Sequence, residues 1–225
     1  MAGNAAATRD KEVDAAQSGT GIVPIIGVNL KFERFNIGLK YEHKASIKVK
    51  NSTKVDDVGL YPDKAEVPSD LPAMFTAGIG FDATEKLKVS AGLHYYFDKN
   101  AEYGKKLDGE YVKNDKVMDK NFWEFALGLE YAINEKWLVS AGYLRTQTGV
   151  MDLYQTDLSH SLSTNSIAAG LRYMVNEKIG INLGAMNTAY VEDTRDFPAA
   201  SPLPQYTETY NRSAFTVALG IDISF

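Results

Sequence analysis

Strict alternation of large apolar residues with small or polar ones is the feature that most constrains this chain. It recurs from Gly21 to the last residue, and helical periodicity is weak throughout. A repeat of two places successive side chains on opposite faces of a β-strand. The pattern predicts nine strands, at residues 21–32, 35–49, 71–82, 86–98, 121–133, 136–147, 164–175, 178–191 and 211–225. The chain is therefore expected to be an all-β protein.

Short and long connections alternate between these predicted strands. The short ones lie at residues 33–34, 83–85, 134–135 and 176–177, and three of them share the pattern ATEK, INEK or VNEK. The long ones are polar and lie at about 50–70, 99–120, 148–163 and 192–210. Tight turns at one end of an antiparallel meander and long loops at the other are typical of up-and-down barrels of the outer membrane.

The two faces of the predicted strands differ in a way that a soluble barrel does not explain. In residues 121–133, for example, Trp123 and Leu127 share one face, whereas Glu124, Gly128 and Glu130 share the other. Parity assigns to the second face nine residues that we expect to line a lumen or contact a ligand: Lys40, Glu42, His94, Tyr96, Glu124, Glu130, Arg172, Met174 and Met186. A face with this much charge suits a water-filled lumen better than the core of a soluble protein.

Aromatic residues on the apolar face fall into two groups with aliphatic residues between them. Near the tight turns lie Phe32, Phe35, Phe81, Tyr131, Trp137, Tyr173 and Phe225. Toward the long loops lie Tyr41, Tyr95, Phe97, Trp123, Tyr143 and Phe215. Two aromatic belts around an aliphatic band match the lipid-facing surface of an outer-membrane barrel, so these residues are expected at the two membrane interfaces.

Each predicted strand also has a glycine near its middle, on the face opposite the large apolar residues. These glycines are Gly27, Gly38, Gly78, Gly92, Gly128, Gly142, Gly170, Gly184 and Gly220. Glycine inside a strand weakens it and often marks a bend or the close approach of another backbone. Two interpretations remain open: that face is cleared of side chains at one level, or curvature alone requires small residues there.

Composition and motifs exclude several function classes. The net charge of −5 gives no basic surface for nucleic acid, and the chain has no cysteine for a disulfide or a thiolate metal site. His43, His94 and His160 are scattered without metal-ligand spacing, and the acidic segment 114–121 lacks the carboxylate spacing of a calcium site. With no catalytic or nucleotide-binding motif present, we expect no enzyme activity, cofactor or bound metal.

The ends of the chain lead to an expectation about orientation and domains. No stretch approaches the roughly 18 apolar residues of a membrane helix, and residues 1–20 do not have the pattern of a secretory signal. If the tight turns are periplasmic, the last strand ends there and residues 1–20 begin on the extracellular side. Because bacterial barrels have even strand numbers, residues 21–225 are expected to be the C-terminal part of a barrel, and residues 1–20 the remnant of a preceding extracellular loop.

The segment SGTGIVPIIGVNLKFERFNIGLKYEHKASIKVKN, residues 18–51, resembles the FadL-type transporters of long-chain fatty acids and hydrophobic compounds of the Gram-negative outer membrane. The later hairpins of the EKxxVSAGxxY type and the terminal strand ending in Phe also resemble this family. The resemblance implies a fourteen-stranded transmembrane barrel with an N-terminal plug, of which about nine strands are present. It also implies passive transport and a terminal strand that the outer-membrane assembly machinery recognises, and the inward glycines would leave room for the plug.

The expected function is passive transport of hydrophobic small molecules by a barrel that is monomeric when complete. The charged lumen residues then form ion pairs, or Lys40 or Arg172 contacts a ligand carboxylate, and Ile25 with other apolar members of that face lines an apolar path. One alternative is a structural or adhesive barrel that acts through its long loops, especially 50–70 and 192–210. Two others are a membrane-embedded enzyme with a Ser, His and acid cluster at the loop rim, and a soluble lipid-binding barrel.

Overall fold

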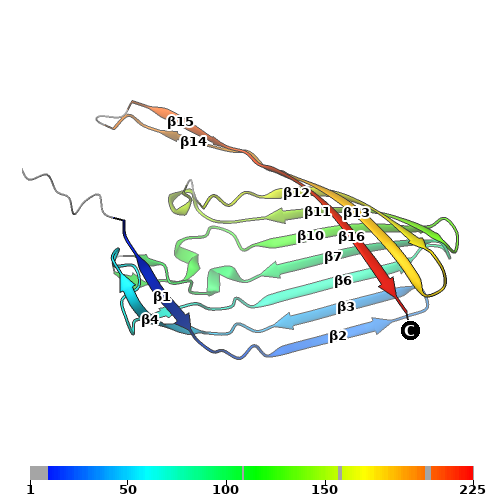
Figure 1. Cartoon of the computed structure of the whole chain (residues 1–225), viewed down its shortest axis with the longest axis horizontal. Coiled ribbons are helices and arrows are strands. Elements are labelled where there is room, and N and C mark those ends of the chain that lie inside the picture. Colours follow the sequence, from blue (N-terminus) through cyan, green and yellow to red (C-terminus); the bar gives the residue numbers. More distant parts are fainter. Residues whose placement is uncertain (1–9, 108, 157–158, 201–203, 225) are drawn as a thin grey trace, which may run out of the picture.

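The chain forms a large antiparallel sheet with smaller sheets at one end (Figure 1). The computed structural model describes residues 10–107, 109–156, 159–200 and 204–224. Its strands are β1 (Val13–Ser18), β2 (Ile25–Lys31), β3 (Phe35–Glu42), β4 (Lys48–Asp56), β5 (Glu66–Pro68), β6 (Met74–Asp82), β7 (Leu87–Tyr96), β8 (Lys106–Leu107), β9 (Glu110–Tyr111), β10 (Trp123–Ala132), β11 (Trp137–Gln147), β12 (Thr164–Met174), β13 (Ile179–Tyr190), β14 (Asp193–Phe197), β15 (Tyr206–Tyr210) and β16 (Ser213–Ile223). Three single 3-10 turns interrupt the loops: η2 (Asp98–Asn100), η3 (Asn114–Lys116) and η4 (Asp152–Tyr154).

The nine strands predicted from alternation form one sheet, in the order β16-β13-β12-β11-β10-β7-β6-β3-β2. Every neighbouring pair is antiparallel. The nine strands lie in the sheet in the same order as along the chain, and the strands of the loops are left out of it. The prediction of an antiparallel up-and-down β-sheet is therefore confirmed. In Figure 1 the tight connections and the C-terminal end gather at one end of the sheet and the long connections at the other.

Three of the tight connections are built in the same way, which explains their shared sequence pattern. In VNEK and INEK the side-chain oxygens of Asn176 and Asn134 each accept two backbone N–H groups, at 2.9 to 3.0 Å. In ATEK the hydroxyl of Thr84 accepts the N–H groups of Lys86 and Leu87, at 3.2 and 3.0 Å. A side chain that satisfies backbone donors in this way stabilises a turn of fixed length, which sets the register of the flanking strands.

Several of the predicted strands extend too far on the loop side. The second strand was expected over residues 35–49, but β3 ends at Glu42 and β4 begins at Lys48 in a different sheet. The segment before β2 and the long loops also contain strands of their own: β1 pairs with β4, β4 with β5, and β14 with β15. The partner of a short alternating segment depends on which strand lies beside it in the folded chain. Local sequence alone does not specify that partner.

Residues 104–113 do not add a tenth strand to the main sheet. They contain β8 and β9, which form a separate two-stranded hairpin rather than joining the main sheet. Gly109, which lies between β8 and β9, has a φ of 87°, a backbone conformation that glycine adopts without strain.

The buried apolar side chains lie at the loop end and not in the main sheet. The buried apolar side chains of the described residues are Ala45, Ala73, Ala101, Val117 and Met118, and all of them belong to connections between strands of the main sheet. The sheet itself exposes large apolar side chains along its length, with Leu219 of β16 73 % exposed and Ile167 of β12 69 % exposed. A sheet without its own core needs an apolar environment on that face.

Among the described residues no helix is long and apolar enough to cross a membrane.

Candidate functional site: the polar face of the sheet and its loop rim

Strand register separates the two faces of the sheet, because residues directly opposite one another in antiparallel strands lie on the same face. We use "polar face" for the face that includes Gly78, Gly92 and Glu124, and "apolar face" for the face that includes Leu93 and Leu127. Gly38 is opposite Gly78 and Gly78 is opposite Gly92. The same register places on the polar face all nine mid-strand glycines, Gly27, Gly38, Gly78, Gly92, Gly128, Gly142, Gly170, Gly184 and Gly220.

The space above most of these glycines is open. A methyl group added at Gly38 would meet no atom within 4 Å, and at Gly78 and Gly92 its nearest neighbour would be a carbonyl oxygen at 3.8 and 3.9 Å. Gly128 and Gly170 differ, since a methyl group there would lie 2.6 and 2.5 Å from the hydroxyl oxygens of Ser90 and Ser140. Contacts within the described residues therefore explain why two of the nine positions need glycine. At the other positions no neighbouring side chain fills the space above the polar face.

The ionisable residues predicted for the lumen share this face and form local pairs. Near the loops, Lys40 forms an ion pair with Glu42, and His94 Nδ1 lies 3.4 Å from a carboxylate oxygen of Glu124. The hydroxyl of Thr146 donates to the other oxygen of Glu124 at 3.3 Å. These side chains are partly exposed, so the ion pairs contribute little stability, and they mainly keep the face hydrated.

A second polar group lies on the same face toward the tight turns. Arg172 Nη2 is 3.7 Å from a carboxylate oxygen of Asp222, and the side-chain amide of Asn182 donates to that oxygen at 2.9 Å. The Nε atom of Arg172 is buried without a hydrogen-bond partner among the described residues. Beside these residues is a groove of about 500 Å³, lined by Glu130, Leu138, Ser140, Gly170, Leu171, Arg172, Asn182, Leu183, Gly184, Ala218, Leu219 and Gly220.

Larger apolar or aromatic side chains interrupt the charged residues of the polar face, and four of them were expected there from the sequence. Register places Ile25 opposite Glu42, Tyr96 opposite Met74, and Met186 opposite Ala168. Met174 is opposite Gly180, whose added methyl group would lie 3.0 Å from the Met174 sulfur atom. The polar face therefore combines ion pairs, glycine and adaptable apolar side chains, which is a surface on which a hydrophobic solute and water can both be accommodated.

The predicted interface aromatics lie in or beside the strands on the apolar face. Phe35 stacks on Phe81 at 4.6 Å between ring centroids, and Trp137 contacts Tyr173 at 4.5 Å, both pairs beside tight turns. At the loop end Tyr95 contacts Phe97 at 5.1 Å. Phe32, Tyr41, Trp123, Tyr131, Tyr143 and Phe215 occupy corresponding positions along their strands or next to them. Phe225 lies outside the described residues.

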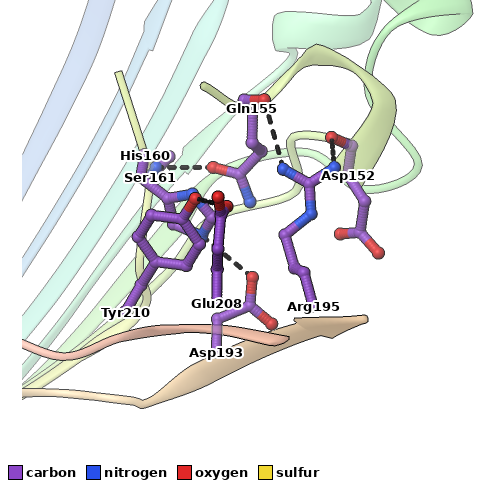
Figure 2. Close-up of polar contacts among 8 residues, drawn as sticks. All are labelled: Asp152, Gln155, His160, Ser161, Asp193, Arg195, Glu208 and Tyr210. Atoms are coloured by element: carbon purple, nitrogen blue, oxygen red, sulfur yellow. Dashed lines mark hydrogen bonds and ion pairs between the residues drawn. The ribbon is translucent and has the colours of Figure 1, made fainter. Parts of the chain in front are cut away.

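One polar cluster at the loop rim was not anticipated from the sequence (Figure 2). His160 Nε2 lies 2.9 Å from Asp193 Oδ2, and the imidazole stacks on the ring of Tyr210 at 3.7 Å. The side chain of His160 is only 6 % exposed. Arg195 donates to the backbone carbonyls of Asp152 and Gln155, at 2.7 and 3.2 Å. The cluster joins the connection between β11 and β12 to the β14–β15 hairpin.

This cluster does not have the geometry of a Ser, His and acid triad. In such a triad the imidazole nitrogen that faces away from the carboxylate bonds to the nucleophile. The corresponding atom here, His160 Nδ1, is buried and has no hydrogen-bond partner among the described residues. His94 pairs with Glu124 on the polar face, and His43 Nδ1 bonds to the Tyr41 hydroxyl at 3.1 Å. Within the described ranges, no group of three or more His, Asp or Glu side chains converges as metal ligands, including the segment 114–121.

The remaining loops fold into a cap around buried carboxylates. Asp70 accepts the Lys44 ammonium at 2.8 Å and the backbone N–H groups of Ile47 and Glu102 at 3.1 Å each. Asp98 accepts the Tyr103 hydroxyl at 3.2 Å, and burial together with this carboxylate raises the pKa of Tyr103 above its usual value. Sequence reasoning missed these contacts because a single Asp in a polar loop has no pattern that marks it as buried.

Comparison with known proteins gives few relatives by sequence. No family model matches the chain. The 31 kDa outer-membrane immunogenic proteins of Brucella melitensis biotype 1 and Brucella suis biovar 1 are each 32 % identical to it over 116 residues, which is 49 % of this chain and 48 % of theirs. The chain thus spans about half the length of the curated relatives that it matches.

Comparison of structures gives broader matches, each covering about nine tenths of this chain. A Pseudomonas aeruginosa FadL homologue aligns with a TM-score of 0.56 at 18 % identity, over 88 % of this chain and 50 % of its own. The Pseudomonas putida toluene transporter TodX aligns at 0.54 and 16 % identity, over 92 % and 50 %. The alcaligin outer-membrane receptor FauA of Bordetella pertussis aligns at 0.57 and 14 % identity, over 93 % and 36 %.

These likenesses establish the fold. The chain has the transmembrane β-barrel fold of the Gram-negative outer membrane, and the resemblance to FadL-type channels is confirmed at the level of the fold. FauA shares the fold to the same degree. Fold likeness alone therefore does not separate channels for hydrophobic compounds from other outer-membrane barrels.

Proposed function

We propose that the chain is the wall of a passive channel that admits hydrophobic small molecules across the outer membrane, with its polar face toward the lumen. The observation that carries this proposal is the open glycine surface of that face. Fatty acids and aromatic hydrocarbons are the proposed solutes, and the reaction is diffusion without catalysis.

The residues of the polar face support this assignment. Tyr96, Met174 and Met186 offer apolar contacts on a face that is otherwise hydrated, and methionine adapts its shape to ligands of different outline. Arg172, whose side chain is 42 % exposed, is the proposed contact for a ligand carboxylate, alongside Lys40. The structural neighbours described as a toluene transporter and a monoaromatic hydrocarbon channel support the choice of hydrophobic solutes.

The apolar face is the proposed lipid contact. Its two groups of aromatic residues lie at the two membrane interfaces, and its aliphatic band lies between them. In this orientation the tight turns are periplasmic, and the long loops together with residues 1–20 are extracellular. Outer-membrane lipid, the transported solute and the barrel assembly machinery are then the partners, and the complete barrel acts as a monomer.

Solute uptake by reconstituted protein tests the proposal. The protein is inserted into liposomes, and entry of toluene, a fatty acid and a hydrophilic sugar is measured against liposomes without protein. The expected result is faster entry of one or both hydrophobic solutes and little entry of the sugar. Equal entry of all three solutes would indicate a general pore, and no acceleration of any of them would contradict a channel.

A second candidate is a structural or adhesive barrel that acts through its loops. It is favoured by one observation: the buried apolar side chains of the described residues lie in the loop cap rather than in the main sheet. Loops that only cover a pore do not need buried apolar side chains of their own. Shortening the β14–β15 hairpin distinguishes the two candidates, because it abolishes surface attachment in the adhesive case and leaves solute entry intact.

A further inference from the structure

A polar pocket of about 330 Å³ lies at the loop end of the sheet and takes no part in the lumen proposed above. Three connections enclose it: the segment before β10, the connection between β11 and β12, and the start of β14. The residues of the main sheet that line it are Arg145 and Gln147 of β11. Gln147 is opposite Trp123 and Arg145 is opposite Phe125, so both belong to the apolar face. The pocket therefore lies on the outer side of the wall, at the loop-side aromatic belt.

Arg145 is an unusual residue to find on that face. On one side it is opposite Phe125, and on the other it is opposite Asn165. One of its N–H groups donates to the side-chain oxygen of Gln147 at 3.1 Å. No carboxylate of the described residues forms an ion pair with it. A guanidinium has five N–H donors, so most of its donors remain available.

Carboxylates also line the pocket, but two of the four are already paired. Asp193 bonds to His160 at 2.9 Å, and Asp119 lies 4.0 Å from the ammonium of Lys120. Asp152 and Glu192 are the other two, and both are exposed. The rest of the lining is rich in hydroxyl and amide groups, including Gln155, Ser161 and Ser163. This mixture of one unpaired cation with many donors and acceptors fits a headgroup that has several hydroxyls and an anionic group.

We infer that this pocket binds the phosphorylated sugar headgroup of an outer-leaflet glycolipid. Arg145 holds the phosphate through two N–H groups, a geometry that guanidinium and phosphate share, and the hydroxyl, amide and free carboxylate groups bind the sugar hydroxyls. The acyl chains then extend along the apolar face below. The inference rests on the part of the proposed function that places this face against lipid.

Glycolipid capture by the purified protein in nanodiscs tests the inference. The probes are lipid A with its phosphates, lipid A without them, and phosphatidylglycerol, which is anionic but has no sugar. The protein is expected to retain phosphorylated lipid A in preference to both others. Equal retention of phosphatidylglycerol, or of dephosphorylated lipid A, would overturn the inference without any variant being needed.

Variants locate the site. Arg145→Gln should weaken retention of phosphorylated lipid A roughly tenfold, the usual loss when a charge-assisted hydrogen-bond pair is removed, and Arg145→Lys should be intermediate. Arg34→Gln, at a tight turn on the other end of the sheet, is the matched control and should bind as the unaltered protein does. Equal binding by Arg145→Gln and Arg34→Gln would refute the site. Solute entry is measured on the same preparations. If lipid A is retained but no solute enters, only the channel proposal is contradicted. If solute enters but lipid A is not retained, only the proposed pocket is contradicted.

Discussion

His160 Nε2 lies 2.9 Å from Asp193 Oδ2, and this contact joins two loops that are 33 residues apart in the sequence. The imidazole is nearly buried, and it stacks on Tyr210 at 3.7 Å. His160 of the β11–β12 connection thereby contacts one residue from each strand of the β14–β15 hairpin, as Figure 2 shows. The position of the hairpin above the barrel thus depends on a few polar contacts rather than on an apolar core.

Replacing His160 should release these two loops from one another. His160→Ala removes the hydrogen bond and the stacked ring and leaves Asp193 without its partner, at a local cost of roughly 1–3 kcal/mol. Hydrogen exchange should accelerate in residues 148–156 and 159–163 and in β14 and β15, while the main sheet stays protected. His43→Ala, which changes an exposed histidine at the same end, is the control. Equal exchange in both variants would show that the contact does not hold the loops together.

Tyr103 gives the loop cap a dependence on alkaline pH. Burial, and then the nearby carboxylate of Asp98, raise the pKa of Tyr103 in the folded loop above its ordinary value of 10.0. The folded loop thus favours the neutral phenol. Its contribution to stability is complete below pH 10 and is lost as the pH rises through the higher pKa of the folded state. Exchange in residues 98–107 should therefore accelerate above pH 10.

Tyr103→Phe provides the comparison for this effect, since it removes the ionisable hydroxyl and its hydrogen bond to Asp98. The variant should be less protected at neutral pH and should lose the additional acceleration at alkaline pH. Tyr111→Phe, in the same loop, should keep the alkaline response. The explanation would be wrong if Tyr103→Phe responded to alkaline pH as strongly as the unaltered chain.

A pair of adjacent residues in β10 tests which face of the sheet meets lipid. Leu127 is on the apolar face and 45 % exposed, whereas Ala126 is on the polar face opposite Gly92. A lysine on the lipid face near the middle of the membrane costs about 2–4 kcal/mol, and a lysine in the lumen costs little. Leu127→Lys should therefore lower the free energy of unfolding in vesicles by that amount, and Ala126→Lys should not. The opposite ranking would reverse the assignment of the faces.

The glycine surface should control solute passage without controlling the fold. A side chain added at Gly78 has room, since the nearest atom to its Cβ would be the Ala91 carbonyl oxygen at 3.8 Å. Gly78→Leu should insert into membranes normally and slow the entry of hydrophobic solutes several-fold, because the side chain projects from the polar face. Ala77→Leu adds the same atoms on the other face and should leave entry unchanged. Equal entry in both variants would argue that solutes do not pass over this surface.

Much of the fold could be predicted because period-two alternation reports on a local property, namely which side of a strand meets which environment. It located all nine strands of the main sheet, and turn chemistry at Thr84, Asn134 and Asn176 located the tight ends. The loop end was different. Residues 43–49 continue the alternating pattern of β3, yet β4 pairs with β1 and β5. Asn51 of β4 is opposite Gln17, 34 residues earlier, and Lys48 is opposite Pro68, 20 residues later.

The sequence by itself determined that this chain is a membrane-spanning sheet with an apolar and a polar face, since alternation, aromatic placement and turn residues are all local signals. Only the tertiary structure decided which polar residues meet. Arg172 with Asp222, His160 with Asp193 and Asp70 with Glu102 are contacts between segments distant in the chain. Their partners depend on how loops of variable length close, and side-chain chemistry leaves many equivalent pairings open until the backbone has brought two segments together.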